Sequence, residues 1–363
     1  SADTVTFRDT ASFSGNTGVG TLLNNLSTAT VSFANGATFD RNTNPLNGSL
    51  VNTGTVNGTG GDFIFTNNTG SNGGGLKNAG TVSIDTSGRI LFDTNTTTST
   101  AGALDNGGTI TMKSGNISFT NNKSNAGYSG AIFNAGDLSL LGAPNTFSGN
   151  IASDTGATSS GGGAIHNRGN SGTSTLIIGT QSSTNTFTSN TSSAHGGAIL
   201  SRAFNGASHD SIITVNGTSA FRNNNAAFNG GAILNVTSND GGVSEITFNG
   251  NTSFTNNTAG GMGGAIYNND TITFNGNANF SGNTADGTAN DIHNDGTVNM
   301  NGNTTIAGGI TGNGTLNVAS GKTLNIGTAT LTQGAVNLDG TLLATLRTGN
   351  TAQINVADAG GFT

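Results

Sequence analysis

The chain has 363 residues with 60 Gly and no Cys, and its 18 acidic and 11 basic residues give a formal charge of -7. The absence of Cys excludes disulfides and thiolate metal sites, and the scattered Lys and Arg argue against a nucleic-acid-binding surface. No run approaches the roughly 18 apolar residues of a membrane helix. Because the chain starts at Ser1 without a signal h-region, we expect a processed or truncated segment, with any membrane anchor outside it.

Two short motifs alternate along the chain. One is Phe-x-x-Asn, and the other is Gly-Gly-Ala-Ile or a looser version of it. The Phe residues are Phe13, Phe39, Phe65, Phe92, Phe119, Phe147, Phe187, Phe221, Phe254 and Phe280. The second motif ends at Leu22, Leu50, Leu76, Leu104, Ile132, Ile165, Ile199, Ile233, Ile266 and Ile292. A repeat of about 26 to 34 residues, sustained in this way, is typical of a solenoid.

Each repeat contains three short apolar segments. Residues 264–283 read Gly-Ala-Ile-Tyr-Asn, Thr-Ile-Thr-Phe and Asn-Phe-Ser-Gly-Asn, separated by turns. Alternation in Thr271 to Phe274 places apolar residues on one face and threonines on the other. Strands this short need pairing with the same strand one repeat away. The sequence therefore predicts an all-β, right-handed parallel β-helix of about 12 or more rungs, with three short strands per rung.

The repeat pattern also predicts which residues stack along the axis. We expect the motif phenylalanines to stack inside. Asn at one turn of successive rungs should form a hydrogen-bonded ladder; its members are Asn134, Asn167, Asn235 and Asn268. Residues 1–295 carry the two motifs, whereas 296–363 show a tighter pattern, as in Thr315 to Val318 and Thr323 to Ile326. We interpret 296–363 as a continuation of the same helix with shorter rungs.

The alternating motifs over roughly residues 10–295 resemble the chlamydial-type polymorphic outer-membrane proteins, which carry these two tetrapeptides as their hallmark. Residues 319–324, Ala-Ser-Gly-Lys-Thr-Leu, resemble the junction rungs that precede the barrel in many autotransporters. The resemblance implies a type V autotransporter passenger, exported through its own C-terminal outer-membrane barrel, which would lie outside this chain. It further implies an extracellular adhesin, displayed on the bacterial surface or secreted, whose partner is a host-cell receptor or surface glycan. A self-associating structural surface or fibre protein is the main alternative, and a polysaccharide-degrading enzyme is the third.

The acidic residues and histidines do not form a convincing catalytic or metal site. Glycoside hydrolysis needs paired carboxylates, but Glu245 is the only Glu and the 17 Asp are scattered through turns. The densest acidic group is Asp286, Asp291 and Asp295, which lies in a decayed copy of the repeat. No nucleophile elbow accompanies the His residues; those that invite a triad are His166, His195 and His209 with Asp210. We expect no catalysis, no metal and no cofactor.

Two features are candidate binding surfaces. The residue after each motif Ile should face outward, which predicts an apolar stripe that either contacts a partner or is covered by a loop of the same chain. Its members are Phe133, His166, Leu200, Leu234, Tyr267 and His293. Three adjacent rungs also carry insertions at 168–174, 202–210 and 236–244, which should form one ridge. Partner-binding candidates on the ridge are Arg168, Arg202, Phe204, His209 and Asp210. Neutral drift of surface turns is the alternative for the ridge.

Overall fold

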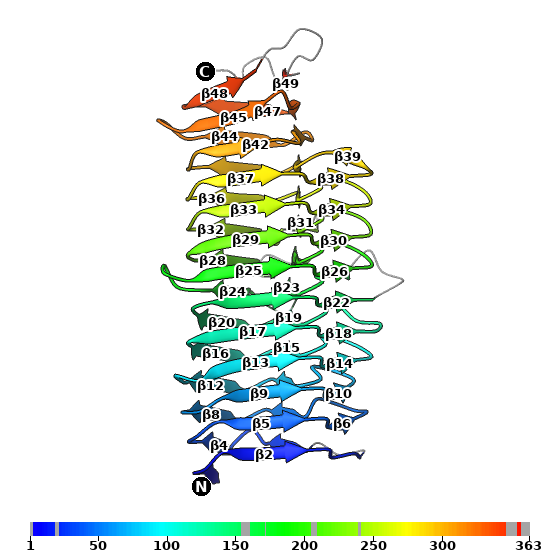
Figure 1. The fold of residues 1–363 in the computed structure, drawn as a ribbon, viewed down its shortest axis with the longest axis vertical. Helices are drawn as coiled ribbons and strands as arrows, with labels where there is room; N and C mark the ends of the chain where they lie inside the picture. Colours follow the sequence, from blue (N-terminus) through cyan, green and yellow to red (C-terminus); the bar gives the residue numbers. More distant parts are fainter. Residues whose placement is uncertain are drawn as a thin grey trace.

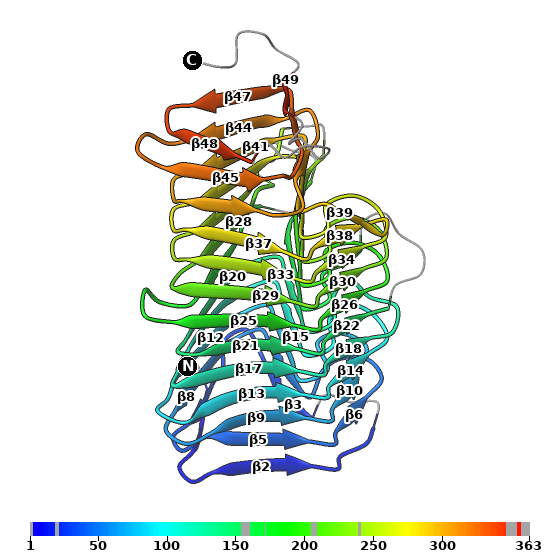
Figure 2. The same cartoon turned by 45° about the horizontal axis from the view of Figure 1, so that its top comes forward.

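The computed structural model describes residues 3–18, 22–153, 160–170, 172–204, 209–238, 241–345 and 354–356. Over these residues the chain winds as a right-handed parallel β-helix, with strands stacked from the N-terminal to the C-terminal end of an elongated molecule (Figures 1 and 2). Each rung pairs with the rungs before and after it, so sequence order is also spatial order. The predicted fold class is confirmed.

Three large sheets run the length of the helix, each with 13 strands among the described residues. Sheet 1 consists of β1 (Thr4–Phe7), β4 (Thr30–Phe33), β8 (Thr55–Thr59), β12 (Thr81–Asp85), β16 (Thr109–Ser114), β20 (Asp137–Gly142), β24 (Ser174–Ile178), β28 (Ser211–Val215), β32 (Ser244–Phe248), β36 (Thr271–Phe274), β41 (Thr297–Met300), β44 (Thr315–Val318) and β47 (Ala335–Leu338). Sheet 2 consists of β2 (Ala11–Ser14), β5 (Ala37–Asp40), β9 (Phe63–Thr66), β13 (Arg89–Asp93), β17 (Asn116–Thr120), β21 (Asn145–Ser148), β25 (Thr184–Thr188), β29 (Thr218–Arg222), β33 (Thr252–Thr255), β37 (Ala278–Ser281), β42 (Thr304–Ile306), β45 (Thr323–Gly327) and β48 (Thr341–Ala344). Sheet 3 consists of β3 (Leu23–Asn25), β7 (Leu50–Asn52), β11 (Leu76–Asn78), β15 (Leu104–Asn106), β19 (Ile132–Asn134), β23 (Ile165–Gly169), β27 (Ile199–Ala203), β31 (Ile233–Thr237), β35 (Ile266–Asn268), β40 (Ile292–Asn294), β43 (Ile310–Thr311), β46 (Leu331–Gln333) and β49 (Ile354–Val356).

A fourth sheet, the short-strand sheet, is an addition to the three strands per rung expected from the sequence. Its strands have two residues each and form a separate column beside the large sheets in Figure 1. They are β6 (Thr43–Asn44), β10 (Thr69–Gly70), β14 (Thr96–Thr97), β18 (Lys123–Ser124), β22 (Ile151–Ala152), β26 (Thr191–Ser192), β30 (Asn225–Ala226), β34 (Thr258–Ala259), β38 (Thr284–Ala285) and β39 (Thr288–Ala289). The last pair, β38 and β39, is antiparallel. A two-residue strand is too short to produce an alternating pattern, so periodicity could not reveal it.

The Phe-x-x-Asn motif builds the corner between sheet 2 and the short-strand sheet. The phenylalanines stack in one unbroken internal column from Phe13 to Phe280, with successive ring centroids 4.5 to 5.5 Å apart. This confirms the predicted stack. The second x residue has a positive φ, for example 54° at Asn67 and 53° at Asn121, where Gly and Asn are best tolerated. That turn directs the motif Asn inward.

The motif asparagines form a second buried ladder beside the phenylalanines. Asn122, for example, donates from Nδ2 to the Phe92 carbonyl of the preceding rung at 2.9 Å and to Asn150 Oδ1 of the next at 3.1 Å. Its Oδ1 accepts from the main-chain N–H and the side-chain amide of Asn95, both at 3.0 Å. Buried amides with all their groups paired hold successive corners in register.

The Gly-Gly-Ala-Ile motif builds the entry into sheet 3. Its first Gly has a positive φ, as at Gly196 (59°). A Cβ on the second Gly, as at Gly197, would lie 2.0 Å from the Gly231 carbonyl oxygen of the next rung, so only Gly fits. The Ala and Ile then face the core and are fully buried. The predicted ladder at the end of these strands is confirmed: Asn134 donates to Asn167 at 2.7 Å, and Asn235 to Asn268 at 2.8 Å. Ser201 interrupts it between these two pairs.

The three large sheets continue past residue 296 through β41 to β48, whereas the short-strand sheet ends at β39. The rungs beyond this point are shorter because they lack the fourth strand, and Figure 1 shows the orange and red rungs without it. At the transition Asp291 takes over from the motif asparagines. Its buried carboxylate accepts from Asn283 Nδ2 at 2.7 Å and from the Gly308 N–H at 2.6 Å.

Candidate functional site

The outer face of sheet 3 carries most of the residues selected from the sequence. Strands β23, β27 and β31 have five residues each, whereas β19 and β35 have three. The first two residues of each predicted insertion therefore extend a strand. Arg168 pairs with Arg202, and Arg202 pairs with Val236 on the following rung. The insertions are thus only partly surface turns, and residues 171, 205–208 and 239–240 lie outside the described residues. The extended strands place a second outward-facing column beside the first.

Half of the residues of the predicted apolar stripe are buried. His166 and Leu200 are fully buried, and Leu234 is 4% exposed, so the prediction that these three are accessible is wrong. Phe133, Tyr267 and His293 are half-buried. The alternative of coverage by the same chain is correct for His166, because its ring packs against Tyr128, which precedes β19, with centroids 5.8 Å apart. The burial of the residues after the motif Ile depends on the segments that connect the strands, such as the one that carries Tyr128, and the alternation within a strand does not describe those segments.

Six side chains on this face form the arginine–aromatic cluster: Tyr128, Phe133, His166, Arg168, Arg202 and Phe204. The Arg168 guanidinium lies 4.2 Å from the Phe204 ring centroid and 5.0 Å from that of Tyr128. The Arg202 guanidinium lies 4.6 Å from the Phe204 ring. Cation–π contacts of this kind contribute roughly 0.5 to 2 kcal/mol each, depending on desolvation. They fix two long cationic side chains that are otherwise conformationally mobile.

His166 lies beneath these cations. Its ring packs edge-to-face against Phe133 at 5.5 Å, and neither ring nitrogen makes a hydrogen bond of normal geometry to the described residues. Burial, followed by the charges of Arg168 and Arg202, holds the pKa of His166 well below its usual range, while the main chain of Tyr128 acts weakly in the opposite direction. The imidazole is therefore neutral at physiological pH, and it adds no positive charge beside the two guanidiniums.

Among the described residues, the side-chain hydrogen bonds of Asp210 go to the neighbouring insertions and not to the cluster. Asp210 thereby connects the insertions: Oδ1 accepts from the Val243 N–H at 2.9 Å, and Oδ2 accepts from Thr173 Oγ1 at 3.3 Å. His209 is half-buried next to it. The structure thus brings together five of the predicted residues, Phe133, His166, Arg168, Arg202 and Phe204, and adds Tyr128. The sequence signal for Tyr128 is an aromatic residue four positions before the motif residue Ile132, whereas the predicted stripe consists of residues directly after the motif Ile.

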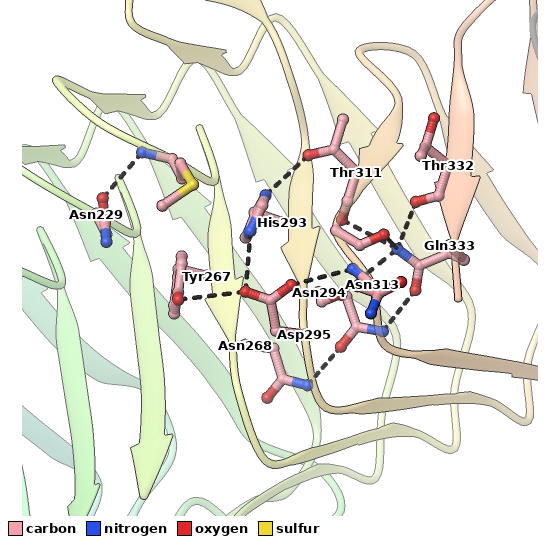
Figure 3. Close-up of polar contacts among 12 residues, drawn as sticks. Asn229, Tyr267, Asn268, His293, Asn294, Asp295, Thr311, Asn313, Thr332 and Gln333 are labelled. Carbon is pink, nitrogen blue, oxygen red and sulfur yellow. Dashed lines mark hydrogen bonds and ion pairs between the residues drawn. The ribbon is translucent and has the colours of Figure 1, made fainter. Parts of the chain in front are cut away.

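A second polar group lies further along the same face, at β35, β40 and β43 (Figure 3). Tyr267 stacks on His293 with centroids 5.2 Å apart. His293 Nε2 is 3.1 Å from Asp295 Oδ2, and Nδ1 is 3.0 Å from Thr311 Oγ1, as Figure 3 shows. Asp295 also accepts from the Tyr267 hydroxyl at 3.4 Å and from the Asn313 N–H at 3.0 Å. A recess of about 200 Å³ lies beside His293 and Thr311.

The sequence of hydroxyl, imidazole and carboxylate resembles a hydrolytic triad, but its bonding favours a structural role. Thr311 Oγ1 also accepts from Asn290 Nδ2 at 3.0 Å, so the hydroxyl is engaged on both sides. Asp295 receives three partners from three rungs, and the group lies where the short-strand sheet ends.

Within the described part of the chain, no group of three or more His, Asp or Glu side chains is placed to bind a metal ion. None of the described residues lies in a helix long and apolar enough to cross a membrane.

Comparisons with family models, with curated proteins and with solved structures found no match to this chain.

Proposed function

We propose that this chain is a non-enzymatic, surface-displayed binding protein, an adhesin of the autotransporter-passenger type, acting outside the cell. The observation that carries the proposal is the arginine–aromatic cluster, which is built on the only three sheet-3 strands of five residues in the described chain. Half-buried Arg and aromatic side chains are the residue types that dominate binding hot spots. The sequence resemblance to the polymorphic outer-membrane proteins supports the same assignment.

The scaffold favours recognition because it removes most of the ordering cost of binding. The rungs under the cluster are connected by paired strands on both sides, by the stacked phenylalanines and by two polar ladders. A ligand that meets such a surface does not have to immobilise it, so more of the contact energy appears as affinity. A long, rigid rod also places the cluster away from whatever surface holds its end.

Adhesion can be tested with a variant in which the insertions are replaced by the two-residue Asn269–Asp270 turn of the Ile266 rung. The segments replaced are 168–174, 202–210 together with Ser211, and 236–244, so that Thr175, Ile212 and Glu245 take the place of Thr271 in the register. The matched control shortens the turn 179–183, which connects sheet 1 to sheet 2 in the Ile165 rung, to the Asn216–Gly217 turn of the next rung. Binding of purified protein to cultured animal cells and to matrix-coated plates should be lost in the first variant and retained in the control. Both should keep the β-sheet circular dichroism spectrum of the wild type.

Two outcomes would contradict the proposal. Wild-type protein that binds none of these surfaces, and that forms polymers by light scattering instead, would make the chain a self-associating structural protein. An insertion-shortened variant that still adheres would remove the cluster from consideration and leave other faces of the rod.

A further inference from the structure

The arginine–aromatic cluster places two positive charges side by side on a negatively charged molecule. Arg168 and Arg202 are direct partners in the register of β23 and β27, and like charges directly opposite each other in a sheet destabilise it. Burial, followed by the charge of Arg168, lowers the pKa of the Arg202 guanidinium. The whole chain, by contrast, has a formal charge of -7. Two guanidiniums held side by side form a site whose charge is complementary to an anion.

The polar contacts of Arg168 within the protein are weak. Within the described part of the chain, its side chain donates one hydrogen bond, from Nη2 to Asn170 Oδ1 at 3.5 Å, and its buried Nε has no partner there. None of the four ion pairs found in the described part of the chain includes it. The guanidinium is held by the rings of Tyr128 and Phe204 rather than by an acid. Its planar set of donors therefore remains suited to a carboxylate or sulfate, which Arg binds with two parallel hydrogen bonds.

The surroundings of the two guanidiniums favour a sugar over a peptide. An extended peptide recognised through its backbone needs a free sheet edge, but β23 is paired with both β19 and β27, and β27 with both β23 and β31. Next to the cations lie half-buried aromatic rings, with Tyr128 and Phe133 centroids 5.3 Å apart. A sugar ring has C–H groups on its faces and, in acidic sugars, an anionic group at its edge, so it can contact rings and guanidiniums together.

We infer that the arginine–aromatic cluster binds an acidic polysaccharide, with Arg168 and Arg202 engaging uronate carboxylates or sulfate esters and Tyr128 with Phe133 contacting the sugar rings. This inference rests on the proposed function and specifies its ligand. Paired strands lie about 4.8 Å apart, so the two cations form a short row along the axis of the rod. A polymer aligned with that axis would meet both.

The test measures binding of defined oligosaccharides to the full chain by isothermal titration calorimetry. The probes are a heparin octasaccharide with sulfates and carboxylates, a hyaluronan octasaccharide with carboxylates alone, and a neutral chitin hexasaccharide. At least one acidic probe should bind, with affinity falling as salt is raised, and the neutral probe should not. The two acidic probes distinguish sulfate from carboxylate as the recognised group. Arg168→Gln should weaken binding at least tenfold, and Arg168→Gln with Arg202→Gln should abolish it.

The matched control is Arg222→Gln, an exposed arginine on sheet 2, which should change affinity less than twofold. If the melting temperature of Arg168→Gln is below that of the wild type, Arg168→Lys becomes the informative variant. It keeps the charge but not the planar donor set, and it should still bind the acidic probe several-fold more weakly than the wild type. Equal binding of neutral and acidic probes, or no effect of either Arg168 variant, would overturn the inference. Failure of both acidic probes to bind would do so as well.

A parallel adhesion assay separates this inference from the proposed function. Adhesion that persists in a large excess of both acidic octasaccharides would reject the acidic ligand while leaving an adhesin. Absence of adhesion together with absence of oligosaccharide binding would reject both.

Discussion

At the scale of single residues, the stacked phenylalanines make the largest individual contributions to the core. Phe221 is fully buried, with its ring 4.5 Å from that of Phe187 and 4.8 Å from that of Phe254. Phe221→Ala should reduce the free energy of unfolding by roughly 3 to 5 kcal/mol, because rigid neighbours on both sides cannot collapse into the cavity. Thr273→Ala, on the outer face of β36, should cost at most about 1 kcal/mol, the usual worth of the hydrogen bond it accepts from Asn299. Urea unfolding of both variants decides it, and equal losses would mean that the inner and outer faces are assigned wrongly.

His166 provides a second test at this scale, through pH. Its pKa is well below the usual value of about 6.5 because of burial and of Arg168 and Arg202. The unfolded chain therefore binds a proton below about pH 6.5 that the folded chain does not, and stability falls as pH is lowered, by about 1.4 kcal/mol per pH unit. His166→Leu, which copies the buried Leu200 of the next rung, removes this proton linkage. Its stability relative to wild type should rise between pH 7 and pH 5, as measured by urea unfolding at each pH. Parallel pH profiles would show that His166 binds its proton equally well in the folded and the unfolded chain.

At the scale of elements, the polar ladders are as important as the apolar column. Asn122→Ala should cost roughly 2 to 4 kcal/mol, because it removes one buried amide and leaves the Phe92 carbonyl and the Asn95 donors without a partner. Asn279→Ala, at an exposed position on β37, should change stability by about 0.5 kcal/mol or less. Thermal and urea unfolding measure both. A small effect at Asn122 would mean that water replaces the amide.

The strands of the three large sheets and those of the short-strand sheet differ in how far they could be predicted from the sequence. The strands of the three large sheets were predictable because Phe39, Ile165 and their equivalents occupy fixed repeat positions. The two-residue strands were not, since Thr96–Thr97 shows no alternation and its sheet depends on the positive φ at Thr94. Arg168, Arg202 and Phe204 could be selected because they lie in adjacent insertions of equal register. Their contact with Tyr128 and the burial of Leu200 depend on connections from other rungs, which the pattern of one strand cannot describe.

At the scale of the whole molecule, a rung contacts only its neighbours, so whole rungs should be removable. In the register of β13 and β17, Asp93 lies opposite Thr120, and deletion of residues 94–120 removes one full turn. The product should fold with an unchanged β-sheet spectrum and unfold cooperatively with a modestly lower melting temperature, because nearest-neighbour interactions are restored at the junction. Deletion of residues 94–106 removes about half a turn and should prevent folding, because every later strand then meets the wrong sheet. The two deletion variants are compared by circular dichroism and thermal melting. Similar spectra and melting temperatures would contradict a stability that is the sum of contributions from each rung and its neighbours.

The stacking direction of the backbone hydrogen bonds also gives the molecule a directional mechanical response. The strands lie across the long axis, and the bonds between rungs point along it (Figure 2). A force that pulls the two ends of the chain apart therefore breaks the bonds of the outermost rung one after another, whereas each inner rung shares the same force among all of its bonds. Extension should occur in steps of one rung, each releasing about 90 Å of extended chain. If the molecule is held at one end and bound to a ligand through its middle rungs, the end rungs should unfold under force while the middle rungs that bind the ligand stay folded.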